Sequence, residues 1–256
     1  MSKAAALPVR LAIAVPTYNE SKNITKLIKG IKDATNKAGV FCTVLIIDDN
    51  SPDGTEDIAD KLATQENDVA FKIQILHRQA KQGFDKAYIA GFHKLLQGNF
   101  THIMQMDADL SHDPKYISQF IKAASEADFV VGSRYVKGGG TPDWAVHRRL
   151  LSHFGNIYAR VFLGNNIHDY TGGFNLFSSQ LLKSINSDSL EANGYGFLIE
   201  LKYRALKHCQ HVKEIPIVFI ERQHGVSKIP RTTILKNLIL VPKLALSNQL
   251  APPRRL

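Results

Sequence analysis

Short apolar runs alternate with amphipathic segments through the first two thirds of the chain. The apolar runs have strand length and are bounded by turn residues, whereas the segments between them repeat apolar residues every three or four positions, the period of a helix. The predicted strands are Leu11–Val15, Val44–Ile47, Phe71–Leu76, His102–Met106 and Phe129–Gly132, and the predicted helices are Ser21–Lys37, Thr55–Thr64, Lys86–Gln97, Pro114–Ala124 and Arg148–Leu163. This alternation indicates a single α/β domain with a mostly parallel central sheet flanked by helices.

The last segment, residues 229–256, has a different character. It carries Ile234, Leu238 and Leu246 with basic residues beside them, and it ends in Pro252-Pro-Arg-Arg. A basic amphipathic helix is typical of membrane-surface binding, and a helix that packs on the protein's own core or on a partner subunit shows the same pattern. We therefore divide the chain into a main domain over residues 1–228 and this tail, and we keep both interpretations of the tail.

Composition narrows the class of protein. The chain has 256 residues, of which 44% are hydrophobic and 21% charged, so it can build a core and is not disordered. It offers neither a run of about 18 apolar residues nor the apolar core of a signal peptide, and we expect a cytoplasmic protein. The net charge of +9, from 32 basic and 23 acidic residues, favours a polyanionic partner. Because no nucleic-acid-binding motif accompanies this charge, we expect no nucleic acid.

Four polar clusters follow predicted strands at their carboxyl ends. They are Pro16–Glu20, Asp48–Thr55, Asp107–Ser111 and Gly132–Tyr135. Asp, Asn, Ser and Gly also form ordinary turns, so one cluster alone carries little weight. Ligands of open parallel sheets bind beyond the carboxyl ends of the strands, and four clusters at that edge favour a binding site there.

Asp107 and Asp109 are the most informative of these residues. In an extended segment, residues two apart point the same way, so both carboxylates could face one cation. Paired carboxylates suit Mg²⁺ or Mn²⁺, which are hard ions that also bind phosphate oxygens. An Asp-x-Asp pair is weak on its own, and its position directly after a strand strengthens the prediction of a metal site.

In their order these motifs resemble family 2 glycosyltransferases and, within that family, the polyprenol-phosphate (dolichol-phosphate) mannosyltransferase group. The resemblance covers residues 11 to 228 and implies a nucleotide-sugar-transferase fold of the Rossmann-like GT-A type. Its segments are Pro16-Thr-Tyr-Asn-Glu20, Asp48-Asp-Asn-Ser-Pro-Asp-Gly-Thr55, Asp107-Ala-Asp-Leu-Ser-His112, Gly132-Ser-Arg-Tyr135, Trp144 with Arg148-Arg-Leu-Leu-Ser152, Asp169-Tyr-Thr-Gly-Gly-Phe174 and Glu221-Arg-Gln-His-Gly-Val-Ser-Lys228. One departure is Gly83-Phe84-Asp85, where the family often has Gly-Leu-Gly.

The resemblance implies a donor site at the first three clusters. Its residues would be Pro16, Tyr18, Glu20, Ile47 and Asp49 for the nucleoside, and Asp107, Asp109 and the backbone of Ala108 for the metal and the donor diphosphate. Some members have a metal-binding Gln two residues after the second Asp, and Ser111 at that position would be a shorter, weaker ligand. Arg222 and Lys228 would lie on a mobile loop that closes over the diphosphate.

The resemblance also implies an acceptor site. Arg134, Arg148 and Ser152 would grip the acceptor phosphate and, with Asp109, form the catalytic set. Arg148 and Ser152 are four residues apart on a predicted helix, hence on one face, and a guanidinium can hold two phosphate oxygens. A phosphate acceptor is already anionic near neutral pH, so it needs no general base. We assign His112, which borders the metal motif, a structural role.

The implied reaction is the inverting, metal-dependent transfer of mannose from GDP-mannose to a polyprenyl (dolichyl-type) monophosphate, a step of protein glycosylation. We expect peripheral contact with the cytoplasmic face of a membrane, and a membrane-anchoring helper subunit is left open. One alternative is the same chemistry with glucose or another hexose from a UDP donor. A second is a non-catalytic module that binds lipid phosphate or another anion, against which the acidic set Asp49, Asp107 and Asp109 argues, because it would repel such a ligand.

Overall fold

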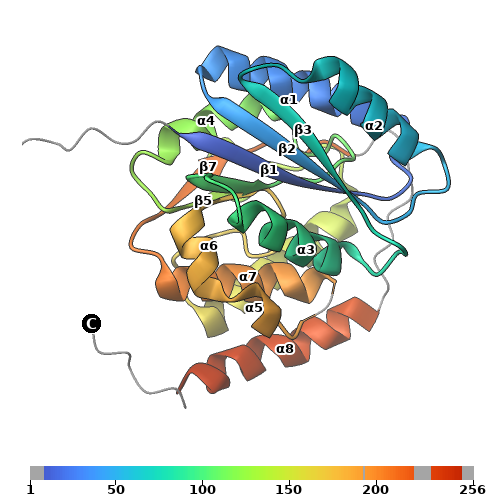
Figure 1. The fold of residues 1–256 in the computed structure, drawn as a ribbon. Helices are drawn as coiled ribbons and strands as arrows, with labels where there is room; N and C mark the ends of the chain where they lie inside the picture. The colour runs from blue at the N-terminus through green and yellow to red at the C-terminus, as the bar shows by residue number, and fades with distance from the viewer. Residues whose placement is uncertain (1–8, 193, 222–231, 250–256) are drawn as a thin grey trace, which may run out of the picture.

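The computed structural model describes residues 9–192, 194–221 and 232–249. Within them one seven-stranded sheet has the order β3-β2-β1-β4-β6-β5-β7 (Figure 1). The strands are β1 (Arg10–Thr17), β2 (Phe41–Asp48), β3 (Phe71–His77), β4 (His102–Gln105), β5 (Phe129–Ser133), β6 (Asn175–Ser178) and β7 (Val212–Pro216). Strands β1 to β4 pair in parallel, as do β5 and β7, while β6 is antiparallel to both β4 and β5. The predicted α/β fold with a mostly parallel sheet is confirmed.

Helices cover both faces of the sheet. They are α1 (Ile24–Ala38), α2 (Thr55–Glu66), α3 (Phe84–Leu96), α4 (Ile117–Ala123), α5 (Val146–Leu163), α6 (Ser179–Ile185), α7 (Tyr195–His208) and α8 (Thr232–Gln249), with short 3₁₀ turns η1 (Pro114–Tyr116) and η2 (Ser187–Ser189). Figure 1 shows α1, α2 and α4 on one side of the sheet and α3 and α5 to α8 on the other.

Alternation along the strands builds the two cores. In β1, Leu11, Ile13 and Val15 pack with the side chains of α1, α2 and α4, whereas Ala12 and Ala14 face α3 and its neighbours. The apolar face predicted for the first helix, formed by Ile24, Leu27, Ile28 and Ile31, is fully buried in the first of these cores. The apolar pattern therefore fixes which way each element faces, and the polar strand ends are left for the edge of the sheet.

Helix α8, in the predicted tail, packs on α5 and α7. Val241 and Leu244 are buried in the core, and the Tyr158 hydroxyl of α5 donates a hydrogen bond to the Leu238 carbonyl at 2.8 Å. Packing on the protein's own core, one of the two interpretations of the tail, thus describes this helix. The division between residues 228 and 229 stays a prediction.

Gly91 provides a test of the packing between α3 and the sheet. A Cβ atom there would overlap Ile47 Cδ1, whereas a Cβ at Gly155 on α5 would meet open space. We predict that Gly91→Ala lowers the free energy of unfolding by about 1–3 kcal/mol through overpacking. The matched change Gly155→Ala should raise it by about 0.5–1 kcal/mol, because alanine loses less backbone entropy in a helix. Urea denaturation measures both, and equal effects of the two changes would contradict this packing.

Candidate active site

The predicted clusters meet at one edge of the sheet. Strand β1 lies between β2 and β4, so the segments that follow these three parallel strands are neighbours. Strand β6 runs the other way and pairs Asn175 with Gln105, the last residue of β4. The turn before β6, Asp169–Phe174, therefore lies at the same edge, which is where ligands of such sheets bind.

Asp48 braces the turn after β2. Its carboxylate is fully buried and accepts hydrogen bonds from the Thr17 hydroxyl at 2.8 Å, the Ser51 hydroxyl at 2.7 Å and the Ser51 N–H at 2.8 Å. The turn after β1 is joined to it, because the Asn19 N–H donates to the Ser51 hydroxyl at 3.0 Å. The first two clusters thus form one hydrogen-bonded unit.

The residues predicted for the nucleoside lie around this unit in different settings. Pro16, Tyr18 and Glu20 are partly exposed, and Glu20 accepts a hydrogen bond from the Asn23 amide at 2.7 Å. Asp49 is buried, and its carboxylate pairs with Arg78 and accepts a hydrogen bond from the Gln82 N–H at 3.2 Å. The side chain of Ile47 is fully buried against Gly91 of α3, and its nucleoside role stays a prediction.

Two cations beside this region were missed at the level of sequence. Arg78 pairs with Asp49, and the Lys81 ammonium lies 3.8 Å from the centre of the Tyr18 ring. Both follow β3, whose carboxyl end carries a fifth polar segment, His77–Gln82. That position after a predicted strand was the signal that could have identified them.

Asp107 and Asp109 stand on a bend beyond β4. Strand β4 ends at Gln105, and Leu110 adopts a left-handed backbone with φ of 65°. Residues 108–110 form a bend, so the segment is not extended over its whole length. The two side chains also differ: that of Asp107 is 44% exposed, whereas Asp109 is buried and accepts a hydrogen bond from the Ser111 N–H at 3.1 Å. A non-glycine residue with positive φ is uncommon and often marks a functional turn.

Asp107 is oriented by two buried rings. The Tyr88 hydroxyl donates to Asp107 Oδ1 at 2.8 Å, and burial together with this carboxylate holds the pKa of Tyr88 well above its usual value, so the hydroxyl keeps its proton. The Asp107 N–H donates to His112 Nδ1 at 3.0 Å. Burial lowers the pKa of His112, and its neutral ring then carries the proton on Nε2, 3.8 Å from Asp107 Oδ2. The structural role predicted for His112 fits these contacts.

These residues fit a hard divalent cation. No group of three His, Cys, Asp or Glu side chains within the described ranges has metal-binding geometry. Mg²⁺ commonly uses one or two carboxylates and takes its other ligands from water and substrate phosphates, which the pair Asp107 and Asp109 can satisfy. The buried Ser111 hydroxyl has no hydrogen-bond partner among the described residues and could supply a further oxygen.

Arg134, at the end of β5, forms a buried ion pair with Asp169. Its Nε and Nη2 donate to the two Asp169 oxygens, each at 2.8 Å, and its own N–H donates to Asp169 at 3.1 Å. Nη2 also donates to the Thr171 hydroxyl at 2.7 Å. Sequence reasoning found Arg134 and the Asp169 motif separately and did not predict their pairing.

A second buried cation completes this network. The Lys202 ammonium of α7 donates to the Asp169 carbonyl at 2.5 Å, and burial lowers the pKa of Lys202 to about 8 although Asp169 opposes the shift. Burial alone would raise the pKa of Asp169, but the Arg134 and Lys202 cations outweigh it and hold this pKa well below its usual range. Asp169 is therefore ionised at neutral pH.

Arg148 and Ser152 lie beside this network on α5. Arg148 Nη1 pairs with Glu221 Oε1 at 2.8 Å, and its guanidinium carbon lies 4.0 Å from the centre of the Trp144 ring. The Ser152 hydroxyl accepts a hydrogen bond from the Tyr135 hydroxyl at 2.6 Å. An adjacent cavity of about 670 Å³ is lined by Arg134, Tyr135, Gly139, Gly140, Thr141, Pro142, Arg149, Leu150, His153 and Val218. Arg149, which lines this cavity, is the second arginine of the motif Arg148-Arg-Leu-Leu-Ser152 and was not among the predicted site residues.

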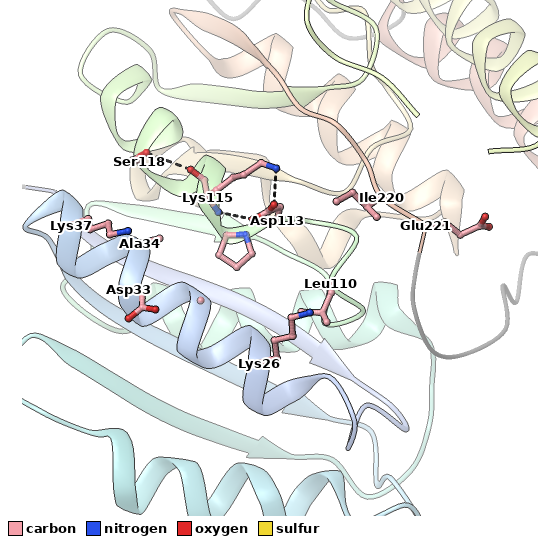
Figure 2. Close-up of a pocket in the computed structure, with 12 residues that line it drawn as sticks. Lys26, Asp33, Ala34, Lys37, Leu110, Asp113, Lys115, Ser118, Ile220 and Glu221 are labelled. Atoms are coloured by element: carbon pink, nitrogen blue, oxygen red, sulfur yellow. Dashed lines mark hydrogen bonds and ion pairs between the residues drawn. The ribbon is translucent and has the colours of Figure 1, made fainter. Parts of the chain in front are cut away.

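Figure 2 shows another cavity, of about 480 Å³, between α1 and the segment that leads into α4. Lys26 and Lys37 of α1 line it together with Asp113 and Lys115, which form an ion pair at 2.8 Å. The cavity touches the candidate site through Leu110 and Glu221, and none of the predicted site residues lines it. The remaining predicted site residues, Arg222 and Lys228, fall outside the described residues.

The comparison with protein families decides the assignment. The family described as "Glycosyl transferase family 2" matches this chain over residues 12–185, which is more than half of its length. The chain belongs to this family. The family predicted from the motifs is thereby confirmed, and the protein is a glycosyltransferase.

Two relatives of this glycosyltransferase match over most of their lengths. The undecaprenyl-phosphate mannosyltransferase of Micrococcus luteus is 37% identical over 221 residues, which is 86% of this chain and 88% of the relative. The polyprenol monophosphomannose synthase of Mycolicibacterium smegmatis is 36% identical over 242 residues, covering 94% of this chain and 89% of the relative.

Solved structures share the fold of the glycosyltransferase. The mannosyl-3-phosphoglycerate synthase of Rubrobacter xylanophilus has a TM-score of 0.62 at 15% identity and covers 97% of this chain and 76% of its own. The glucosyl-3-phosphoglycerate synthase of Mycobacterium tuberculosis, solved in complex with Mn²⁺, UDP and glucosyl-3-phosphoglycerate, has a TM-score of 0.59 at 18% identity, over 96% of this chain and 82% of its own. At these identities the likeness shows the fold alone, and the predicted GT-A fold is confirmed.

The buried pair gives a prediction for the stability of this glycosyltransferase. Asp169→Asn leaves the Arg134 charge without its partner and should lower the free energy of unfolding by about 3–5 kcal/mol at pH 7. Because the folded-state pKa of Asp169 is depressed, its contribution is present above its unfolded pKa of about 4 and is lost as the pH falls below it. The difference between wild type and variant should therefore shrink in acid.

The matched control is Asp188→Asn, which breaks only an exposed pair with His93 and should cost less than about 1 kcal/mol. Denaturant unfolding of the three proteins between pH 7 and pH 3 measures these values. A difference between Asp169→Asn and wild type that stays constant across this range would contradict the assignment of Asp169 as a buried, ionised partner.

Proposed function

We propose that this glycosyltransferase transfers mannose from GDP-mannose to a polyprenyl monophosphate, with inversion at the sugar carbon and with Mg²⁺ or Mn²⁺ bound at Asp107 and Asp109. The observation that carries the proposal is that a carboxylate pair and a group of arginines occur at one edge of the sheet. The carboxylates could hold a metal-bound diphosphate, and Arg134 and Arg149 line a cavity next to Arg148 and Ser152. The names of the two relatives, which cover most of this chain, support the choice of sugar and acceptor.

In the proposed donor complex the chain positions an anionic leaving group. Asp107 and Asp109 would hold the metal, which when bound neutralises the charge that develops on the departing diphosphate. The Tyr88 hydroxyl fixes Asp107 Oδ1, so the carboxylate keeps one orientation toward the ligand. Arg78 neutralises the buried Asp49 beside the nucleoside region, which reduces repulsion of the nucleotide.

In the proposed acceptor complex the nucleophile is a phosphate oxygen. It forms a bond to the anomeric carbon of mannose while the bond from that carbon to the donor diphosphate breaks, and GDP leaves with the electron pair. Attack from the opposite side inverts the configuration. Arg148 and Ser152 would hold the acceptor's other oxygens, and the buried Arg134, whose charge is balanced by Asp169, contacts the same Trp144 ring as Arg148.

The donor base is open to a direct test. Calorimetry with GDP and with UDP, each with Mn²⁺, should show tighter binding of GDP. Tighter binding of UDP would favour the alternative of a UDP-hexose donor, in which the same carboxylates and arginines serve a different sugar.

Asp109→Asn tests the metal site. The change keeps the shape of the side chain and removes its charge, so turnover should fall by about 10²-fold or more while the protein still folds. Asp113→Asn is the control, because Asp113 caps η1 through the Lys115 N–H and pairs with the Lys115 ammonium outside the site. Full transfer activity of the Asp109→Asn protein in excess EDTA would rule out the proposed role.

We also propose that the enzyme reaches its lipid acceptor by lying on a membrane surface through α5. No helix within the described residues is long and apolar enough to cross a bilayer. On α5, however, Val146, Leu150, Phe154 and Val161 share one face by their spacing and are 50–73% exposed.

The opposite face of α5 carries Asn156, Ala159 and Leu163 and is buried in the protein. Cations at Arg149 and Arg160 and a neighbouring His153 border the apolar face, as expected for a helix in an anionic interface.

Helix α8 extends this apolar surface. Leu238, Ile239 and Leu246 are exposed, while Val241 and Leu244 attach the helix to the core. We therefore keep the predicted membrane-binding role for the exposed side of α8. Helix α5 contributes the larger part of the proposed membrane-binding surface.

The membrane proposal predicts different effects for two exposed apolar residues. Phe154→Glu should weaken sedimentation with phosphatidylglycerol vesicles by about tenfold or more, because the lost burial of an aromatic side chain is worth about 1.5–3 kcal/mol. Val69→Glu is the control, since Val69 is 89% exposed just before β3, away from α5. Binding of the purified chain alone also shows whether a helper subunit is needed. Equal vesicle binding by the two variants would contradict a docking role for α5.

A further inference from the structure

Trp144 contacts both arginines of the proposed acceptor site. Its ring centre lies 4.0 Å from the Arg148 guanidinium carbon and 5.3 Å from that of Arg134. The two arginines are 14 residues apart in sequence, one at the end of β5 and the other in the first turn of α5. Trp144 precedes α5 by two residues and is the group through which the structure joins them.

Contact with an aromatic face leaves the edge of a guanidinium available. A guanidinium is planar, so stacking uses its face, while its N–H groups point outward in the plane and can bind oxygen atoms. Arg148 shows this arrangement, because it lies over Trp144 and at the same time donates from Nη1 to Glu221 Oε1 at 2.8 Å. The stacked side chain thus presents its donors to an anionic oxygen.

The Trp144 ring is itself held firmly. The residue is 7% exposed, its backbone N–H donates to the Thr141 carbonyl at 3.3 Å, and its buried indole N–H has no hydrogen-bond partner among the described residues. The ring meets Phe219 edge-to-face, with centres 5.4 Å apart. Phe219 and Tyr135 also lie against Arg134, at 5.7 and 5.5 Å from its guanidinium carbon. Trp144 therefore belongs to an aromatic frame, made of Tyr135, Trp144 and Phe219, whose three rings all contact Arg134 and whose Trp144 ring also contacts Arg148.

Arg134 and Arg148 differ in how they are fixed. Arg134 is held at its edge by the buried Asp169 and by Thr171, so its position does not depend on Trp144 alone. Arg148 has a partly exposed ion pair with Glu221 and the face of Trp144. An exposed ion pair orients a long side chain only weakly, and the aromatic contact is the better defined of its two restraints.

We infer that Trp144 is a positioning residue, which holds Arg148 beside Arg134 so that the two guanidiniums face one phosphate monoester. The inference rests on the proposed function, since it assigns Arg148 to the acceptor. It explains why an indole, the aromatic group with the strongest attraction for cations, lies between two arginines.

Kinetics of the full chain test the inference. Trp144→Leu removes the aromatic face and should lower kcat/KM for polyprenyl phosphate by about tenfold, with GDP affinity measured by calorimetry unchanged. Trp144→Phe keeps a weaker face and should recover most of that loss. Phe71→Leu is the matched control, because Phe71 is also buried and also carries a cation, Lys32, at 5.7 Å, but on the edge strand β3. This control should leave the acceptor constant unchanged.

A second measurement needs no variant. Trp144 is the only tryptophan in the chain, so intrinsic fluorescence reports on this position alone. Titration with geranyl phosphate, a short water-soluble acceptor, should change the emission in a saturable way, whereas geraniol, which lacks the phosphate, should not. The same emission with both compounds would place no phosphate near Trp144 and would overturn the inference.

The outcomes separate the two proposals. If the wild-type chain transfers mannose and Trp144→Leu has the wild-type acceptor constant, the positioning role is wrong and the proposed function stands. A parallel loss of GDP affinity in Trp144→Leu would also overturn the positioning role, because it would show general damage to the site. If the wild-type chain transfers no mannose to polyprenyl phosphate, both proposals fail.

Discussion

The ion pair between Arg134 and Asp169 joins the end of β5 to the turn before β6. The Asp169 carboxylate accepts hydrogen bonds from the Arg134 guanidinium and from the N–H groups of Thr171 and Gly172, so it shapes the turn that leads into β6. The backbone of the same residue accepts from Lys202 of α7 and donates to Glu214 of β7. An unpaired charge at this depth would be strongly unfavourable, and the elements that supply the partners must therefore come together correctly.

This constraint also determines the geometry of the candidate site. The turn held by Asp169 places Gly173 where even a Cβ atom would approach the Asp107 carboxylate to 3.5 Å. Its Tyr170 N–H donates to the Asn156 side chain of α5 at 2.7 Å, which ties the helix that carries Arg148 and Ser152 to the same turn. One buried pair thus fixes the carboxylate side and the arginine side of the site relative to each other.

The sequence pattern predicted the elements that follow simple periodicity. Five strands and five helices were recognised, because the strands are short apolar runs and the helices repeat apolar residues every three or four positions. Strand β6 was not predicted, because it has four residues and runs antiparallel within a parallel series. Strand β7 was not predicted either, because Val212–Pro216 mixes charged and apolar residues at an edge of the sheet. Helices α6 and α7 were missed with them.

The sequence predicted which residue types gather in the candidate site, but not how those residues pair with one another. The clusters at strand ends could be found because their position follows from chain order alone. The partners of Arg134 and Asp49 could not, because Asp169 lies 35 residues from Arg134 and Arg78 lies 29 residues from Asp49. The bend at Leu110 was hidden for a different reason, since leucine rarely adopts a positive φ and nothing in the residue types signals it.

The lipid product shows directly which sugar the chain transfers and to which acceptor. The purified chain is incubated with Mn²⁺, a polyprenyl phosphate and either GDP-mannose or UDP-glucose, and the extracted lipid is analysed by mass spectrometry. We expect that GDP-mannose alone adds one hexose to the lipid phosphate, and that NMR of the product shows the anomeric configuration opposite to that of the donor. A lipid product formed from UDP-glucose and not from GDP-mannose, or no hexosyl lipid from either donor, would contradict the proposed function.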